Sequence, residues 1–185
     1  QFFRNVSDIL QADLDSKQIM NADAADLGGR VRKRGDGMSI DVEKIYENVR
    51  KKVSFQPRAA LILGSGLGNF AETVQIAETL DYHDIDGFPV STVPGHKGRF
   101  IFGYVDEVPM VIMQGRVHYY EGYSMEQVTL PIRLMKLMGA QLLFLTNASG
   151  GVNTDYHAGD FMLISDHISS FIPSPLIGTN NEKLG

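Results

Sequence analysis

The sequence has no cysteine among its 185 residues, so it can form neither a disulfide nor a thiolate metal site. That absence is compatible with the reducing cytoplasm, where we expect the protein to work. No apolar run approaches the roughly 18 residues of a membrane-spanning helix, so we expect no membrane partner. Positive charge is also scarce, since 17 Lys and Arg face 22 Asp and Glu, and the net charge of −5 argues against a nucleic-acid partner.

The remaining composition is typical of a globular domain, with 43% hydrophobic and 21% charged residues. Residues 1–37 differ from the rest because a glycine-rich, basic stretch occupies residues 28–37. We interpret residues 1–37 as an extension or linker foreign to the domain. At the other end, residues 173–181 read as a loop that no helix follows. We therefore expect the domain over residues 38–185 to be truncated at its C-terminus.

Hydrophobic periodicity and turn residues predict two helices and six strands. Val42, Ile45 and Val49 recur at helical spacing, and Ser124 with Gln127 has the spacing of a capping box. The predicted helices are residues 39–53 and 124–138, and the predicted strands are residues 59–63, 78–82, 99–105, 108–113, 142–146 and 161–165. Strands that alternate with helices indicate an α/β domain.

Small residues follow two of the predicted buried strands. The motif GSGLG at residues 64–68 permits positive φ and a close approach to an anion, and Ser65 adds a hydroxyl donor. Asn69 stands where a dinucleotide fingerprint needs glycine, and no P-loop lysine follows. The sequence TNASGG at residues 146–151 also consists of small residues, whose backbone amides a ligand could approach closely. A plain tight turn and an anion-binding loop are both compatible with residues 64–68.

Cationic and aromatic side chains follow the strand predicted to end at Met113. If the extended backbone continues, Arg116, His118 and Tyr120 project to one side of it, and Tyr119 projects to the other. A guanidinium, an imidazole and a phenol that leave a strand end together can bind a phosphate and a sugar hydroxyl. The alternative is an edge strand with a solvated polar face.

Four segments are predicted to lie together at the carboxyl ends of the strands. His96 occupies the exposed tip of a turn at residues 93–99, and ligands of open α/β sheets bind at the carboxyl ends of strands, where the loops described above also lie. Metal binding has little support, because the pairs His157 with Asp160 and Asp166 with His167 lack a further ligand at a suitable spacing. We therefore predict no metal site.

Together these segments resemble the trimeric purine nucleoside phosphorylases. The matching motifs, in the family's order, are LILGSGLG at residues 61–68, VPGHKGR at 93–99, MQGRVHYYEGY at 113–123, TNASGGVN at 146–153 and GDFMLISDHI at 159–168. The resemblance extends from about residue 38 to residue 185. It implies a phosphorylase/hydrolase-like three-layer α/β fold with a mixed central sheet.

The resemblance also implies an activity, which is the phosphate-dependent cleavage of purine nucleosides to free base and (deoxy)ribose 1-phosphate. Phosphate is then a co-substrate, and no cofactor is implied. The partners implied are a purine nucleoside, phosphate and two further copies of the chain in a homotrimer. The role implied is purine salvage.

Residue roles follow from the matched positions. The residues matched to the family's phosphate ligands are Ser65, His96, Arg116, His118 and, through its backbone amide, Ala148. Those matched to the ribose and base side are Tyr120, Ser149 and Gly150. Arg116 and His118 are the expected catalytic residues, Glu121 is expected to orient His118, and Phe171 is expected to reach a neighbouring subunit's ribose pocket.

The chain also departs from the family pattern. The glutamate and asparagine with which the family recognises the purine lie further along than residue 185, and Thr179 stands where proline is usual. We therefore expect this chain to hold the phosphate half of a site and to be inactive or nearly so by itself. A non-catalytic phosphate- or nucleoside-binding module and an inert fragment are the alternatives, and the preference between 6-oxo and 6-amino purines stays open.

Overall fold

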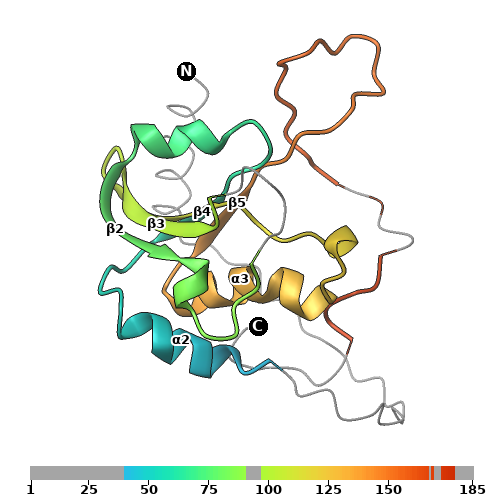
Figure 1. Cartoon of the computed structure of the whole chain (residues 1–185). Coiled ribbons are helices and arrows are strands. Elements are labelled where there is room, and N and C mark those ends of the chain that lie inside the picture. The colour runs from blue at the N-terminus through green and yellow to red at the C-terminus, as the bar shows by residue number, and fades with distance from the viewer. Residues whose placement is uncertain (1–39, 91–96, 167, 169–171, 178–185) are drawn as a thin grey trace, which may run out of the picture.

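The computed structural model describes residues 40–90, 97–166, 168 and 172–177. A five-stranded sheet with the order β2-β3-β4-β1-β5 forms its centre (Figure 1). The strands are β1 (Ala59–Ile62), β2 (Gln75–Asp81), β3 (Arg99–Val105), β4 (Val108–Gln114) and β5 (Leu142–Leu145). The helices are α2 (Val42–Arg50) and α3 (Met125–Leu137), with short 3-10 helices η1 (Gly68–Thr73), η2 (Tyr82–Asp84) and η3 (Tyr119–Glu121).

The sheet is mixed, and its parallel part positions the site. Strand β1 pairs in parallel with β4 on one side and with β5 on the other, while β3 runs antiparallel to both β2 and β4. The register places Ile62 opposite both Met113 and Leu145. The three segments that follow β1, β4 and β5 therefore leave the sheet side by side at one edge.

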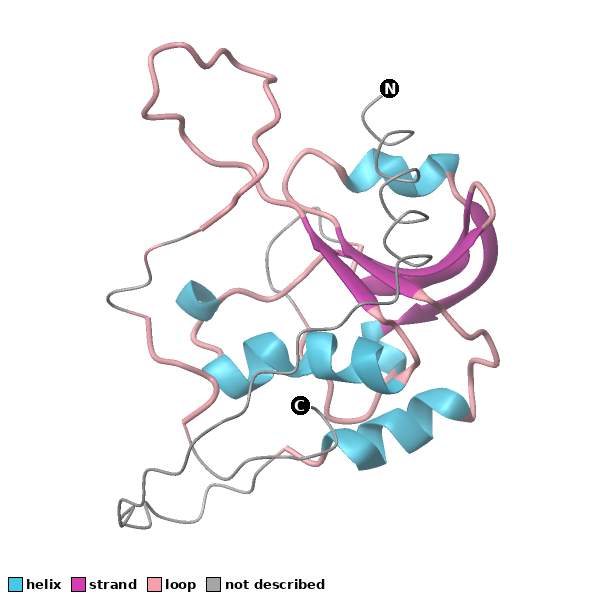
Figure 2. Cartoon of the chain, turned by 180° about the vertical axis from the view of Figure 1, so that it is seen from behind, coloured by secondary structure: helices cyan, strands magenta, loops and turns pink. Residues whose placement is uncertain are grey.

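Helices α2 and α3 cover one face of the sheet (Figures 1 and 2). Val49 of α2 and Leu134 of α3 are fully buried in the same core cluster as Phe100 and Phe102 of β3. Burial of side chains of this size contributes roughly 1.5–3 kcal/mol each. This amphipathic packing explains why helices form here, because their buried apolar residues recur at helical spacing and pack in the core beneath the sheet.

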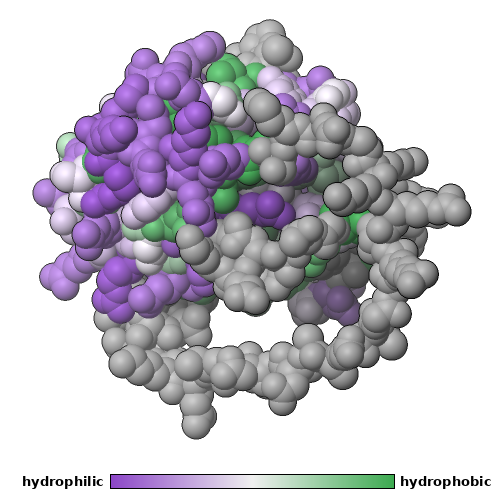
Figure 3. Space-filling view, turned by 90° about the horizontal axis from the view of Figure 1, so that it is seen from below, coloured by the Kyte–Doolittle hydropathy of each residue, from purple (hydrophilic) through white to green (hydrophobic). Residues whose placement is uncertain are grey.

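The outward face of α2 is polar, as its sequence predicts. Lys44 and Glu47 are exposed, whereas Val42 and Ile45 are buried. Seen from below, the left side of the molecule is mostly hydrophilic, with small hydrophobic areas between the polar side chains (Figure 3). Asp41 caps the helix, since its carboxylate accepts a hydrogen bond from the Lys44 amide at 3.0 Å.

The other face of the sheet is covered by η1. Ala71 and Val74 pack in a second core cluster with Leu61 of β1, and the cluster also holds Ile101 and Ile112 of the two neighbouring strands. The result is the three-layer α/β arrangement with a mixed central sheet that the family resemblance implies. Among the described helices, none is both long and apolar enough to cross a membrane.

The predicted helix at residues 124–138 is confirmed to within one residue at each end. The Ser124 hydroxyl accepts from the Gln127 amide at 3.2 Å, and the Gln127 side chain accepts from the Ser124 amide at 2.9 Å. This is the reciprocal capping box that the spacing predicts. Gly139 follows the helix with a φ of 115°, a left-handed conformation that favours glycine.

Two predictions of extended structure are wrong. Residues 161–165 form no strand, and Phe161 and Leu163 are 61% and 89% exposed, because no neighbouring strand pairs with their backbone. The strand that ends at Gln114 does not continue through Tyr120 either, since residues 119–121 turn into η3. Residues 1–37, which the sequence marks as a separate extension, lie outside the described residues.

Candidate functional site

A cavity of about 290 Å³ lies at the edge where β1 and β4 end. It is lined by the glycine loop after β1, by the start of η1, by the residues after β4 and by Lys97 just before β3. The lining residues are Leu63, Gly64, Ser65, Gly66, Gly68, Asn69, Lys97, Gln114, Gly115, Arg116 and His118. The topology therefore brings together segments that lie up to 55 positions apart in the sequence, from residue 63 to residue 118.

The glycine loop needs glycine at two positions for different reasons. A Cβ on Gly64 would lie 2.5 Å from the Thr146 carbonyl oxygen, so only glycine permits this close approach to the end of β5. Gly66 has open space around it but a φ of 83°, which strains other residues. The exposed Ser65 stands between them on the cavity wall.

Thr146 connects the glycine loop, β1 and Arg116. Its hydroxyl accepts a hydrogen bond from the Gly64 amide and donates one to the Ile62 carbonyl, both at 2.8 Å. Its own carbonyl accepts from Nη1 of Arg116 at 3.0 Å. One residue at the end of β5 thus contacts both cavity walls.

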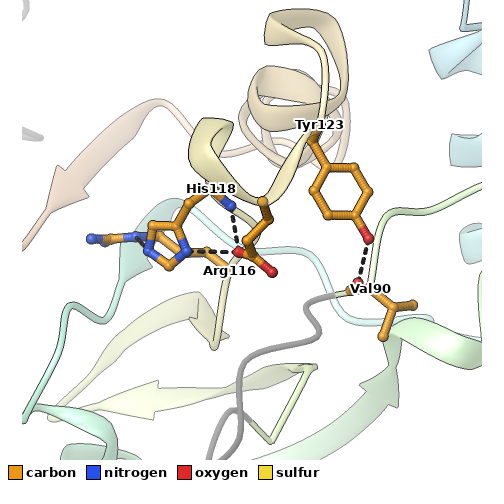
Figure 4. Close-up of polar contacts among 5 residues, drawn as sticks. Val90, Arg116, His118 and Tyr123 are labelled. Carbon is orange, nitrogen blue, oxygen red and sulfur yellow. Dashed lines mark hydrogen bonds and ion pairs between the residues drawn. The ribbon is translucent and has the colours of Figure 1, made fainter.

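Arg116, His118 and Glu121 form a chain of polar contacts beside the cavity (Figure 4). Nε of Arg116 donates to Nε2 of His118 at 3.4 Å, and Nδ1 of His118 lies 2.8 Å from a carboxylate oxygen of Glu121. The same oxygen accepts from the His118 backbone amide at 2.8 Å. Because an ionised carboxylate only accepts, the proton of this contact is carried by Nδ1, which leaves Nε2 for the Arg116 side.

The turn that carries His118 is held in place on both sides. The ring of Tyr120 stacks on the imidazole with 4.8 Å between centroids and 19° between planes, although Tyr120 itself is 77% exposed. The hydroxyl of Tyr123 donates to the Val90 carbonyl (Figure 4). The imidazole is therefore fixed by Glu121, by Tyr120 and by the chain on either side of it.

Charge and hydrogen-bond capacity suit the cavity to an anion. The described lining residues include two cations, Lys97 and Arg116, and no carboxylate. The Ser65 hydroxyl and the backbone amides of a glycine-rich turn are further donors on the same wall. In the described part of the chain, no group of three or more His, Cys, Asp or Glu is placed to hold a metal ion. The exposed pair of His157 and Asp160, with 3.7 Å between Nδ1 and the carboxylate, belongs to no such group among the residues described.

The family model described as "Phosphorylase superfamily" matches residues 58–184, which is more than half of the chain. The chain belongs to the phosphorylase superfamily. Purine nucleoside phosphorylase 1 of Geobacillus stearothermophilus is 47% identical over 144 residues, which are 78% of this chain and 53% of that protein. The chain spans about half the length of the curated relatives it matches.

Solved structures within this superfamily agree with the fold. A Schistosoma mansoni purine nucleoside phosphorylase in complex with inosine is 43% identical, with a TM-score of 0.59, and the match covers 64% of this chain and 41% of that one. A purine nucleoside phosphorylase in complex with ribose 1-phosphate is 45% identical, with a TM-score of 0.61, over 65% and 44% of the two chains. The α/β fold with a mixed sheet is therefore confirmed.

The phosphorylase fold brings some of the predicted site residues together and leaves others apart. Ser65, Arg116 and His118 line one cavity, and Tyr120 stacks against His118. The predicted residues of the loop after β5 are exposed and do not line that cavity; they are Ala148, Ser149 and Gly150. His96 and Phe171 lie outside the described residues, so their predicted roles stay predictions.

Sequence reasoning missed the side chains that hold this site in place. Gln114 is buried, and its amide group donates to the Gly68 carbonyl at 2.8 Å while its oxygen accepts from Nε of Arg99 at 2.9 Å. Thr146 holds the other end of the glycine loop. One signal could have identified both residues. Gln114 and Thr146 are polar and come directly after apolar runs, at positions where a strand that only fills the core would have another apolar residue.

Proposed function

We propose that this chain carries the phosphate-binding part of a purine nucleoside phosphorylase. The reaction is cleavage of a purine nucleoside by phosphate to free base and (deoxy)ribose 1-phosphate. The observation that carries the proposal is the shared cavity of Ser65, Arg116 and His118, which has donors and cations on its described walls and no carboxylate. The named activity of the relatives, and the ribose 1-phosphate and inosine in the related structures, support the same choice.

The chemistry follows from what phosphate needs. A phosphate oxygen attacks the anomeric carbon of the sugar, the glycosidic bond breaks, and the purine departs with the bonding electrons. Phosphate is a weak nucleophile, so catalysis depends on holding it in position under a sugar that acquires positive charge. Arg116 and His118 are the catalytic residues of this proposal, because both line the phosphate cavity. The Arg116 guanidinium donates to the phosphate, whose remaining charge stabilises the sugar cation, and the His118 ring contacts that guanidinium through Nε2.

The other predicted residues complete the proposed site. Glu121 orients the His118 ring through the contact at Nδ1. We assign Tyr120, which stacks on that ring, to the ribose. We assign the Ala148 amide to phosphate, and Ser149 with Gly150 to the base; because all three are exposed in the described structure, this assignment needs their loop to approach the cavity when ligand binds. Phosphate is the co-substrate, and the proposal involves no cofactor or metal.

The cellular setting proposed for the protein is that of its family. We infer a homotrimer that acts in the cytoplasm in purine salvage, supported by the sequence resemblance to the trimeric phosphorylases. Light scattering after size-exclusion chromatography measures the mass directly. A mass of three chains supports the trimer, and a monomer over a broad range of protein concentration contradicts it.

The decisive experiment measures phosphate binding and phosphorolysis with a matched pair of arginine variants. We expect inorganic phosphate to shift the backbone amide signals of residues 64–68 in the NMR spectrum of the wild type. Arg116→Ala should abolish most of that response and lower kcat/KM for inosine by ~10²–10³ wherever turnover is measurable. The control is Arg133→Ala, since Arg133 lies on α3 and donates to the Pro175 carbonyl at 3.3 Å.

Each outcome has a clear meaning. Release of hypoxanthine that depends on phosphate supports the phosphorylase, and release that is independent of phosphate contradicts it. Phosphate binding at residues 64–68 without turnover is the result expected of this chain by itself, and it contradicts the inert fragment. A non-catalytic binding module would give the same result, so turnover decides between the module and the phosphorylase. An Arg116→Ala protein that binds phosphate as the wild type does removes Arg116 from the mechanism.

A further inference from the structure

We propose that Thr146 is a positioning residue, which holds the glycine loop and Arg116 at a fixed separation so that both can contact one phosphate. The inference rests on the proposed function, because it requires phosphate as the ligand of the cavity. Thr146 does not line that cavity, so its effect must be transmitted through Gly64 and Arg116.

The first observation is that Thr146 extends the sheet by one residue beyond β5. Its backbone amide donates to the Ile62 carbonyl at 3.1 Å, and its hydroxyl donates to the same oxygen at 2.8 Å. Two donors from one residue therefore meet the last carbonyl of β1. This double contact fixes both the backbone and the side chain of Thr146 to the sheet.

The second observation is that the hydroxyl also holds the glycine loop. The buried Gly64 donates its amide to the Thr146 hydroxyl at 2.8 Å, and the backbones approach so closely that a Cβ on Gly64 would lie 2.5 Å from the Thr146 carbonyl. A buried amide that loses its acceptor is costly, so the loop would have to shift to find another. Ser65, the next residue, would shift with it.

The third observation links the opposite wall of the cavity to the same residue. Nη1 of Arg116 donates to the Thr146 carbonyl at 3.0 Å, which fixes one end of the guanidinium group. Contacts to one residue, Thr146, therefore hold both the Ser65 loop and the Arg116 guanidinium, and these contacts fix their separation. Anion affinity depends steeply on such preorganisation, because misplaced donors must reorganise before they bind.

The experiment uses the 185-residue chain and inorganic phosphate, with dissociation constants taken from NMR titrations. Thr146→Val removes the hydroxyl at nearly constant volume and should raise the phosphate dissociation constant about fivefold to tenfold. That is the effect expected if the displaced glycine loop loses one hydrogen bond to phosphate. Thr146→Ser restores a hydroxyl and should stay within about twofold of the wild type. Rescue by serine separates the hydroxyl from the packing of the methyl group.

The matched control is Thr129→Val. The Thr129 hydroxyl is also half-buried and also donates to a backbone carbonyl, that of Met125, at 2.8 Å, but within α3 and outside the cavity lining. We expect Thr129→Val to leave the phosphate dissociation constant unchanged. A merely structural hydroxyl would lower the melting temperature in both valine variants without changing phosphate affinity in either, and that result would overturn the proposal.

The proposal and the proposed function fail in different ways. A wild type that binds phosphate together with a Thr146→Val variant that binds it equally well overturns the positioning role alone. A wild type whose amide signals do not respond to phosphate overturns both. If Thr146→Val does not fold, hydrogen exchange in the wild type tests the proposal instead. The Gly64 amide must exchange slowly before phosphate is added, because the Thr146 hydroxyl accepts its hydrogen bond. Fast exchange of that amide overturns the proposal.

Discussion

Two regions of the molecule contain similar apolar residues with opposite results. The first is the sheet with its helices, within residues 40–145, and the second is the segment after β5, residues 146–166. Strand β4 carries a continuous apolar run, lies between β1 and β3, and is almost wholly buried. Residues 161–164 form a comparable run, yet they are exposed in a segment that loops away from the sheet (Figures 1 and 2). A hydrophobic run becomes a strand only where neighbouring strands satisfy its backbone and other layers cover its side chains.

The largest expected effect comes from one substitution made in both regions. Leu134→Ala removes a fully buried side chain of α3 and should lower the free energy of unfolding by roughly 2–5 kcal/mol, because it leaves a cavity. Leu163→Ala, at 89% exposure, should change it by less than about 0.5 kcal/mol. Urea unfolding of both variants measures the contrast. Equal losses would show that residues 161–164 are packed in solution.

The next effect lies at the junction between the two regions. Gly64→Ala places a Cβ 2.5 Å from the Thr146 carbonyl, and the clash should destabilise the protein by about 1–3 kcal/mol and weaken phosphate binding. The control, Gly66→Ala, meets no atom within 4 Å but must adopt a φ of 83°, so about 1–2 kcal/mol of strain is expected there. Thermal unfolding and phosphate titration together distinguish a displaced loop from local strain. A Gly64→Ala protein with normal phosphate affinity would contradict the close approach.

A smaller effect is expected on phosphate affinity, which should respond to a serine substitution in the first region and not in the second. Ser65→Ala removes a hydroxyl from the cavity wall and should raise the phosphate dissociation constant about fivefold. Ser149→Ala lies in the exposed loop after β5 and should leave that constant unchanged. NMR titration of the two alanine variants against the wild type measures both values. A stronger effect at Ser149 would show that the loop closes over bound phosphate.

The smallest expected effect is a pH dependence of stability that comes from the sheet with its helices. Burial raises the pKa of the Tyr82 phenol well above its usual value of 10.0. The folded state therefore favours the neutral phenol, which donates to the Gly115 carbonyl at 2.7 Å. The resulting stability is complete below pH 10 and is lost as the pH rises above it.

Tyr82→Phe tests this directly. The variant should lose about 1 kcal/mol near neutral pH, for the missing hydrogen bond, and should lack this contribution to the fall in stability above pH 10. Tyr156→Phe changes a tyrosine in the segment after β5 that is 46% exposed, and should follow the wild-type curve. Urea unfolding at several pH values provides the comparison. Parallel curves for the wild type and Tyr82→Phe would contradict the assigned cause.

Much of the fold could be predicted because its signals are local. The capping box of Ser124 with Gln127, and the helical spacing of Val42, Ile45 and Val49, depend on residues only a few positions apart. Strand β3 has the predicted bounds for the same reason. Strand β2 begins three residues before its prediction, because Gln75 and Ile76 pair with Tyr104 and Gly103 although both are exposed.

The candidate site was predicted only in part, because its geometry depends on contacts between distant residues. The sequence pointed to Ser65, Arg116 and His118, which do share a cavity. It gave no indication that Gln114 contacts Gly68 or that the Thr146 hydroxyl accepts from Gly64. These partners lie 46 and 82 positions apart, and hydrophobic periodicity contains no information at such separations.

By itself, the order of residues determined which segments could become helices and strands and which donors were present for an anion, since propensity, capping and charge are properties of short stretches. The tertiary structure alone decided which strands became neighbours, which apolar run stayed exposed, and which donors faced one cavity. The physical reason is that backbone pairing and close approach, such as Gly64 against Thr146, exist only once separate segments have been brought together.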